Sequence, residues 1–186
     1  RTLAVLNGKE SVYDTDLFMP IIQAIERESA RSYSEHVRQM RIVTDHIRSS
    51  VMMIADGVAS SNKDQGYVLR RLIRRSVREL RAVNEKHWSF HGIVDAVIAT
   101  LAETYPTLTE KRQCIADAID GEVAKFAKTM DQGLRELEKL VRIGQIVHIP
   151  DGGQWPIYNR VDAKKAFDIY QTYGFPLEMI QEELAK

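Results

Sequence analysis

Cysteine is almost absent from this chain, since Cys114 is the only one among 186 residues. A single cysteine excludes an internal disulfide, and a lone thiol fits a reducing compartment, where it usually behaves as a small apolar side chain. The chain also lacks an apolar run near the roughly 18 residues that a membrane span needs, and it lacks a charged-then-apolar leader. We therefore expect a cytoplasmic protein without a membrane partner. Because the chain opens at Arg1 without an initiator methionine, we also expect a fragment of a longer protein.

Net charge is absent as well, because 26 basic residues balance 26 acidic ones. Any affinity for nucleic acid must then come from local clusters of charge and not from a global field. Neither common glycine-rich phosphate loop occurs, so no nucleotide site and no cofactor are predicted for this chain alone. His87 and His91 have the spacing of two zinc ligands on a helix, but the aromatic residues between them favour ordinary packing. We predict no metal site.

Arginine, by contrast, is concentrated in one short segment. Six of the twelve residues from Arg70 to Arg81 are arginines. On an α-helix they fall within an arc of roughly 140°, and leucine, isoleucine and valine occupy the opposite side. One face of this predicted helix can bury in a core while the other gathers positive charge that an extended polyanion would neutralise. The segment predicts a nucleic-acid partner; the alternative is a solvated helix whose arginines pair with acidic neighbours.

Hydrophobic periodicity predicts a mainly α fold, an irregular bundle of about six or seven helices. The predicted helices cover residues 16–33, 35–55, 66–81, 90–105, 109–142 and 163–170, with a last one ending at residue 185. Gly57 is expected to form a left-handed cap after the second helix. In the next loop, Ser61 and Asp64 have the spacing of a capping box. A short β-hairpin or ordered loop is expected near residues 145–158, where β-branched residues meet a Pro-Asp-Gly-Gly turn.

Several segments, taken in order, resemble the alanyl-tRNA synthetases. They are Tyr13–Phe18, Arg41–Arg48, Ile54–Val58, Ser61–Asn62, Gly66–Arg75, Phe126–Leu134 and Ala166–Pro176. The resemblance covers nearly the whole chain, and residues 143–159 are the least similar part. It implies that residues 1–15 are the tail of a class II catalytic core. Residues 16–186 would then be the helical tRNA-recognition domain that follows it.

The resemblance also implies a function. The parent enzyme would be an alanine-tRNA ligase, which uses ATP and Mg²⁺ to attach alanine to the 3′ end of its tRNA. This part would bind the acceptor stem of alanine tRNA, whose identity in the family rests on a G·U wobble pair. Arg1 would be a remnant of the ATP site, the arginine of the third class II motif. The fragment alone is expected to be inactive, and its partners would be the tRNA and the rest of the synthetase chain.

Two positions are implied to read bases. A-form RNA exposes its base edges in the shallow minor groove, and by resemblance Asn62 and Gln171 would contact them there. Gln171 stands where the family has an aspartate. Its amide oxygen can still accept a hydrogen bond, but it loses the charge assistance of a carboxylate. Selectivity for the wobble pair is therefore expected to be weaker, or to depend on a different contact.

The phosphate contacts are assigned from the arginine face. The candidates are Lys63, Arg71, Arg74, Arg75 and Arg78. Arg70 and Arg81 lie next to the apolar arc, so they are expected to pair with acidic residues of the long helix, such as Glu122 or Glu136. A protein-interaction module, whose arginine face docks on an acidic partner, is the alternative function. The salt dependence of RNA binding separates the two, because a complex with a polyanion weakens steeply as salt rises.

Overall fold

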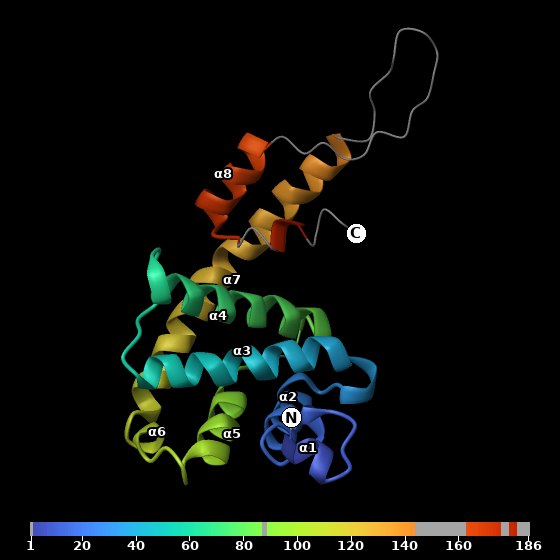
Figure 1. Ribbon diagram of the computed structural model, residues 1–186. Helices are drawn as coiled ribbons and strands as arrows, with labels where there is room; N and C mark the ends of the chain where they lie inside the picture. Colours follow the sequence, from blue (N-terminus) through green and yellow to red (C-terminus); the bar gives the residue numbers. More distant parts are fainter. Residues whose placement is uncertain (1, 87–88, 144–162, 176–178, 182–186) are drawn as a thin grey trace, which may run out of the picture. The chain divides into compact units, whose positions relative to one another are not determined.

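The computed structural model describes residues 2–86, 89–143, 163–175 and 179–181, and these residues form helices and no strands (Figure 1). The helices are α1 (Thr2–Leu6), α2 (Met19–Ser29), α3 (Val37–Ala55), α4 (Asp64–Val83), α5 (His91–Leu101), α6 (Thr107–Glu110), α7 (Arg112–Ile143) and α8 (Ala163–Tyr173), with 3₁₀ turns at Val12–Asp14 and Tyr33–Glu35. The mainly α fold class is confirmed. The hairpin or loop expected near residues 145–158 lies outside the described residues, as do Arg1 and part of the last predicted helix.

The chain forms two compact units, Arg1–Val123 and Ala124–Lys186, and the division falls within α7. The boundary that the resemblance places after residue 15 separates functional parts and not compact units, so it stays a prediction. In the described part of the chain, no helix is both long and apolar enough to cross a membrane.

The first unit is built around α3 and α4, which pack side by side (Figure 1). Both helices carry the apolar stripes that the sequence predicts, and most residues of these stripes are buried, while Val37 and Leu72 are half-buried. The buried residues are Met40, Val43, Ile47 and Val51 of α3 and Leu69, Ile73, Val77 and Leu80 of α4. Helices α2 and α5 pack on each other and on α3. Because burial of each such side chain contributes about 1.5–3 kcal/mol, these stripes fix which face of α4 turns outward.

A backbone cap ends α3 and sets the start of the loop toward α4. Gly57 has φ +90°, its N–H donates to the Ile54 carbonyl at 2.9 Å, and the Val58 N–H donates to the Met53 carbonyl at 3.0 Å. This pair of bonds is a Schellman motif, which a glycine at this position permits. The left-handed cap predicted at Gly57 is therefore confirmed. In addition, Lys111 Nζ donates to the Ala55 carbonyl at 2.5 Å, where the helix dipole favours a cation.

The second unit packs the later part of α7 against α8 and the segment after it. The rings of Phe126 and Phe175, both fully buried, meet edge to face with centroids 5.6 Å apart. Thr129 Oγ1 donates to the Tyr173 carbonyl at 3.1 Å. At Gly133, an added Cβ would lie 2.4 Å from Phe175 Cε2. A glycine inside a helix costs up to about 1 kcal/mol relative to alanine, and here it permits this close approach.

Candidate nucleic-acid interface

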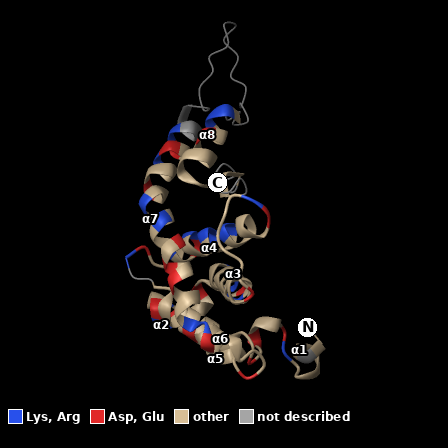
Figure 2. Cartoon of the chain, turned by 90° about the vertical axis from the view of Figure 1, so that its left-hand side faces the viewer, with Lys and Arg blue, Asp and Glu red and all other residues tan. Residues whose placement is uncertain are grey.

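All six clustered arginines lie on α4, and Figure 2 shows lysine and arginine along this helix. The predicted helix and its two-sided character are confirmed. The arginine side is less open than a solvated face, however, since the exposed fraction of the side chain is 13% for Arg74 and 12% for Arg78. Long arginine stems can pack along a surface while their charged heads reach its edge.

Glu122 of α7 is the buried partner of this arginine side. Its side chain is 2% exposed, Arg74 Nε donates to its Oε1 at 2.7 Å, and Arg74 Nη2 forms an ion pair with the same oxygen at 2.7 Å. Arg70 Nε lies 3.5 Å from the same oxygen. A buried carboxylate needs such partners, because an uncompensated charge in an apolar interior is costly. The expected pairing of Arg70 with Glu122 is confirmed, whereas the stronger contact of Arg74 was not foreseen.

Two other arginines of α4 also face carboxylates. Arg78 Nη1 lies 3.2 Å from Oε1 of Glu79, a buried residue of the same helix. Arg81 Nη2 lies 3.5 Å from Glu85 Oε1, one helical turn further on. Arg81 therefore has a local partner, and its expected pairing with the long helix stays a prediction. Arg74 and Arg78, predicted to bind phosphate, have internal partners as well.

Asn62 lies in the loop before α4, and Arg70 holds its side chain. Arg70 Nη1 donates to Asn62 Oδ1 in a short hydrogen bond. A guanidinium has no acceptor, so the carbonyl oxygen of the amide must face Arg70. The amide nitrogen of Asn62, which carries two donors, is thereby turned to another direction. The structure places the predicted base-reading side chain beside the arginine side of α4.

The loop itself is fixed by a turn and not by the expected capping box. Lys63 is the N-cap of α4 and makes no side-chain cap bond. Ser61 Oγ instead accepts from the Lys63 N–H at 3.2 Å and donates to the Lys63 carbonyl at 2.8 Å. The predicted Ser61–Asp64 capping box is wrong, since serine supports both local turns and caps and the spacing alone does not separate them.

Gly66 holds this loop close to the first turn of α4. The Ser61 N–H donates to the Gly66 carbonyl at 3.1 Å. A Cβ added at Gly66 would lie 2.4 Å from the Ala59 carbonyl oxygen and 2.3 Å from Ser61 Oγ. Only glycine permits so close an approach of the loop backbone, so Gly66 fixes the place from which Asn62 projects.

His46 marks where α3 meets the arginines of α4. Its pKa is lowered from the usual 6.5, first by burial and then by the positive charge of Arg75; the carboxylate of Asp45 opposes this shift, and Arg71 adds a smaller lowering effect. Two guanidinium groups assigned to phosphate therefore lie close enough to disfavour a third positive charge.

This shift predicts an acid sensitivity. Because the pKa of His46 is lower in the folded state than in the unfolded state, the unfolded chain binds the extra proton first. Stability is then complete above about pH 6.5 and falls as the pH drops below that value. We expect His46→Gln to flatten this part of the profile, measured as the midpoint of urea unfolding between pH 5 and pH 7.5. Identical profiles for the two proteins would contradict the assignment.

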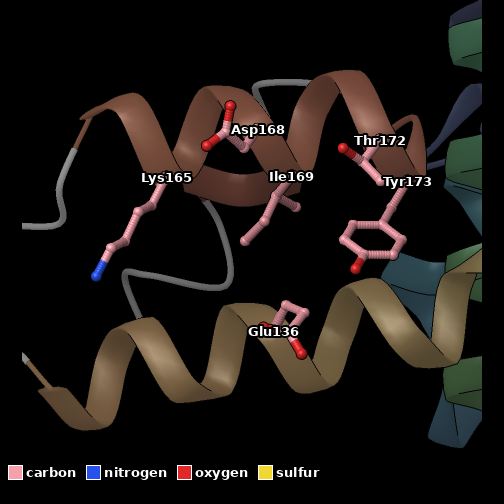
Figure 3. Close-up of a pocket in the computed structure, with 6 residues that line it drawn as sticks. All are labelled: Glu136, Lys165, Asp168, Ile169, Thr172 and Tyr173. Atoms are coloured by element: carbon pink, nitrogen blue, oxygen red, sulfur yellow. The ribbon is translucent and has the colours of Figure 1, made fainter.

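Gln171, the second predicted base-reading residue, belongs to the other unit. It is exposed on α8, beside a shallow pocket of about 230 Å³ between α7 and α8 (Figure 3). The pocket is lined by Glu136, Lys165, Asp168, Ile169, Thr172 and Tyr173. Gln171 is exposed and is not among these residues. Within the described parts of the chain, no three side chains of His, Cys, Asp or Glu could hold a metal ion together.

Comparison with known proteins identifies the family to which the chain belongs. The family model described as tRNA synthetases class II (A) matches residues 1–186. The chain belongs to this family of class II tRNA synthetases. The match covers both compact units, so the arginine helix α4 and the Gln171 helix α8 are parts of one synthetase segment.

Relatives of this synthetase chain carry one name. An alanine–tRNA ligase of Borreliella afzelii is 42% identical over 98% of the chain, which covers 30% of that protein. The alanine–tRNA ligase of Magnetococcus marinus is 37% identical over 99% of the chain, and that of Fervidobacterium nodosum is 35% identical over 98%, each match covering 20% of the relative. The chain thus spans less than a third of the length of these curated relatives.

Sequence reasoning missed a second cluster of the synthetase chain, where α3 meets the segment before α2. Tyr13 donates a short hydrogen bond to Asp45, and burial together with this carboxylate raises the pKa of Tyr13 to about 12. Arg41 stacks over the Tyr13 ring at 4.8 Å and donates to the Tyr33 hydroxyl at 2.6 Å. The signal was present in the segment from Tyr13 to Phe18. From the sequence alone this segment indicates a family motif, and nothing in it indicates an anchor for α3.

Proposed function

We propose that this chain is the tRNA-binding part of an alanine-tRNA ligase. It would hold the acceptor stem of alanine tRNA so that the whole enzyme, with ATP and Mg²⁺ in its catalytic core, attaches alanine to the 3′ end in the cytoplasm. Support comes from the family of the chain, the name shared by its relatives, and the arginine-rich surface of α4. Residues 1–15 would belong to the catalytic core, with Arg1 as part of its ATP site.

The observation that carries the proposal is the orientation of Asn62. Its carbonyl oxygen faces Arg70, so the amide nitrogen is the group left to contact RNA. In a minor groove, pyrimidine O2 and purine N3 atoms accept hydrogen bonds, and the guanine 2-amino group donates. Asn62 would then supply the donor of the reading pair. Gln171 would supply the acceptor, through its amide oxygen, for the 2-amino group of the wobble guanine.

Phosphate contacts would come from residues around the same loop and helix. Lys63 is exposed at the N-terminus of α4, where backbone N–H groups and the helix dipole favour anions. Arg71 and Arg75 lie by His46 and lower its pKa. Arg74 and Arg78 would contribute as well, although carboxylates already neutralise part of their charge.

A salt series tests the electrostatic half of the proposal. In the full-length protein, we expect Arg71→Ala and Arg75→Ala each to weaken binding of an acceptor-stem hairpin equally for G·U and G·C versions. Each lost phosphate contact should reduce the slope of log K against log salt by roughly 0.7–0.9. Filter binding between 50 and 300 mM salt measures both the affinity for each hairpin and the slope. Arg27→Ala, at an exposed position of α2, is the matched control and should leave the slope unchanged.

The competing function is a module that docks an acidic protein. The carboxylates already seated on Arg70, Arg74 and Arg78 favour it, since they show that this surface binds such groups well. Binding of the hairpin without a salt slope, or with the wild-type slope in both the Arg71 and Arg75 variants, would favour this function over RNA binding.

A further inference from the structure

A chain of contacts connects the long helix α7 to the base-reading loop. It begins at the buried carboxylate of Glu122, passes through the guanidinium of Arg70, and ends at the amide of Asn62. These residues come from α7, α4 and the loop before α4, and all belong to the first compact unit. The backbone of the loop has its own support from Gly66, whereas these contacts act on the side chain of Asn62.

Arg70 is held from the side of Glu122. Its Nε is buried and makes no hydrogen bond within the described residues, and the nearest acidic oxygen is Glu122 Oε1 at 3.5 Å. The attraction is therefore mainly that of charge, and in a half-buried position it is only weakly screened by solvent. Without the carboxylate, Arg70 would lose what keeps its guanidinium in the position that meets Asn62.

Glu122 also contacts Arg74. Two nitrogens of Arg74, Nε and Nη2, lie 2.7 Å from Glu122 Oε1. The same carboxylate oxygen therefore contacts arginines on two adjacent turns of α4. An exposed asparagine in a loop would otherwise rotate freely and would lose that freedom on binding, at a cost in affinity. A recognition group that is fixed before binding avoids this cost and discriminates better.

We infer that Glu122 is a positioning residue for RNA recognition, which orients the Asn62 amide through Arg70 without touching RNA. The inference rests on the proposed function. Glu122 is buried and lies 60 positions from Asn62 in the sequence. In this role it would influence which base pair the protein accepts. Glu122 would also have a second effect: its negative charge would weaken the electrostatic attraction between α4 and any RNA.

The test uses Glu122→Gln in the full-length protein, with acceptor-stem hairpins that differ only in G·U or G·C at the read position. We define the ratio as the dissociation constant for the G·C hairpin divided by that for the G·U hairpin. We expect this ratio to fall about fivefold, which is the effect of one hydrogen bond. At the same time, the affinity for the G·C hairpin should rise, because two arginines have lost an internal counter-charge. If Glu122 only stabilised the fold, the substitution would lower the affinity for both hairpins. A rise in affinity for the G·C hairpin therefore separates the positioning role from a purely structural one.

Glu79→Gln is the matched control, since Glu79 is also buried and paired with an arginine of α4 but has no contact with Asn62. It should leave the ratio unchanged. If Glu122→Gln does not fold, Arg70→Lys replaces it, because lysine cannot span both partners with one planar group. In the double variant Asn62→Ala with Glu122→Gln, the ratio should equal that of Asn62→Ala alone.

The outcomes are separable. If Asn62→Ala reduces the ratio while Glu122→Gln and Arg70→Lys both keep the wild-type value, the positioning role of Glu122 is overturned and the proposed function stands. If Asn62→Ala itself leaves the ratio unchanged, the base-reading role of Asn62 fails, and the role of Glu122 fails with it.

Discussion

Replacing Asn62 by alanine is expected to remove most of the preference for a wobble-containing acceptor stem. In the proposed role the side chain would contribute one oriented donor, and a specific base contact of this kind discriminates by about 1–3 kcal/mol, or roughly 5- to 150-fold. Affinity for a Watson–Crick stem should hardly change, because the phosphate contacts are intact. Competition binding with the two hairpins, and kcat/KM for aminoacylation of the two RNAs by the full-length enzyme, measure this loss.

Asn62→Asp makes a sharper control than alanine. Aspartate keeps an acceptor for Arg70 and gains charge assistance there, but it has no donor to offer to RNA. If the amide nitrogen reads the base edge, Asn62→Asp should lose discrimination as alanine does, even though the internal contact with Arg70 is preserved. Equal weakening on both stems by either variant would assign Asn62 to the loop structure instead.

Gly66→Ala is expected to have the largest effect on stability and to damage recognition too. The added Cβ would meet the Ala59 carbonyl oxygen at 2.4 Å, and this backbone atom cannot move without the loop. Overpacking of this kind costs about 1–3 kcal/mol. The displaced loop would also carry Asn62 away from Arg70. Urea unfolding and the hairpin ratio should therefore change together.

Gly121→Ala provides the comparison for that experiment. Gly121 is also helical, but an added Cβ there meets no atom within 4 Å. The substitution should stabilise the protein by up to about 1 kcal/mol, because alanine favours the helix more than glycine does. A comparable gain at Gly66 would contradict the view that close packing of the loop requires a glycine there.

The helices were largely predictable because each carries its own pattern. The stripes of α3, α4 and α7 repeat over several turns and identify both the element and its buried face. Helices α1 and α6 were not predicted, since five and four residues are too few for a period to be visible. Gly57 was predictable because left-handed caps depend on a local chain geometry.

The candidate site was only partly predictable. Asn62 rests on the resemblance, because nothing in its local sequence distinguishes a base-reading asparagine from an ordinary loop residue. The pairing of Arg74 with Glu122 joins positions 48 residues apart, and neither the arc on a helical wheel nor the spacing reveals such a contact. The position of Arg70 at the edge of the arc did indicate its pairing. For arginines in the middle of the charged arc, such as Arg74, the identity of the partner depends on tertiary packing.

The carboxylates seated against α4 change how strongly this protein would attract RNA in general. Four of the six arginines face Glu79, Glu85 or Glu122, and these three carboxylates set against six arginines leave an excess of three positive charges on this helix side. If the chain binds RNA as proposed, fewer counterions would be released on contact with an arbitrary strand, and its residence on unrelated transcripts would be short. In a cell crowded with ribosomal RNA, such restraint would keep the synthetase available for its own substrate.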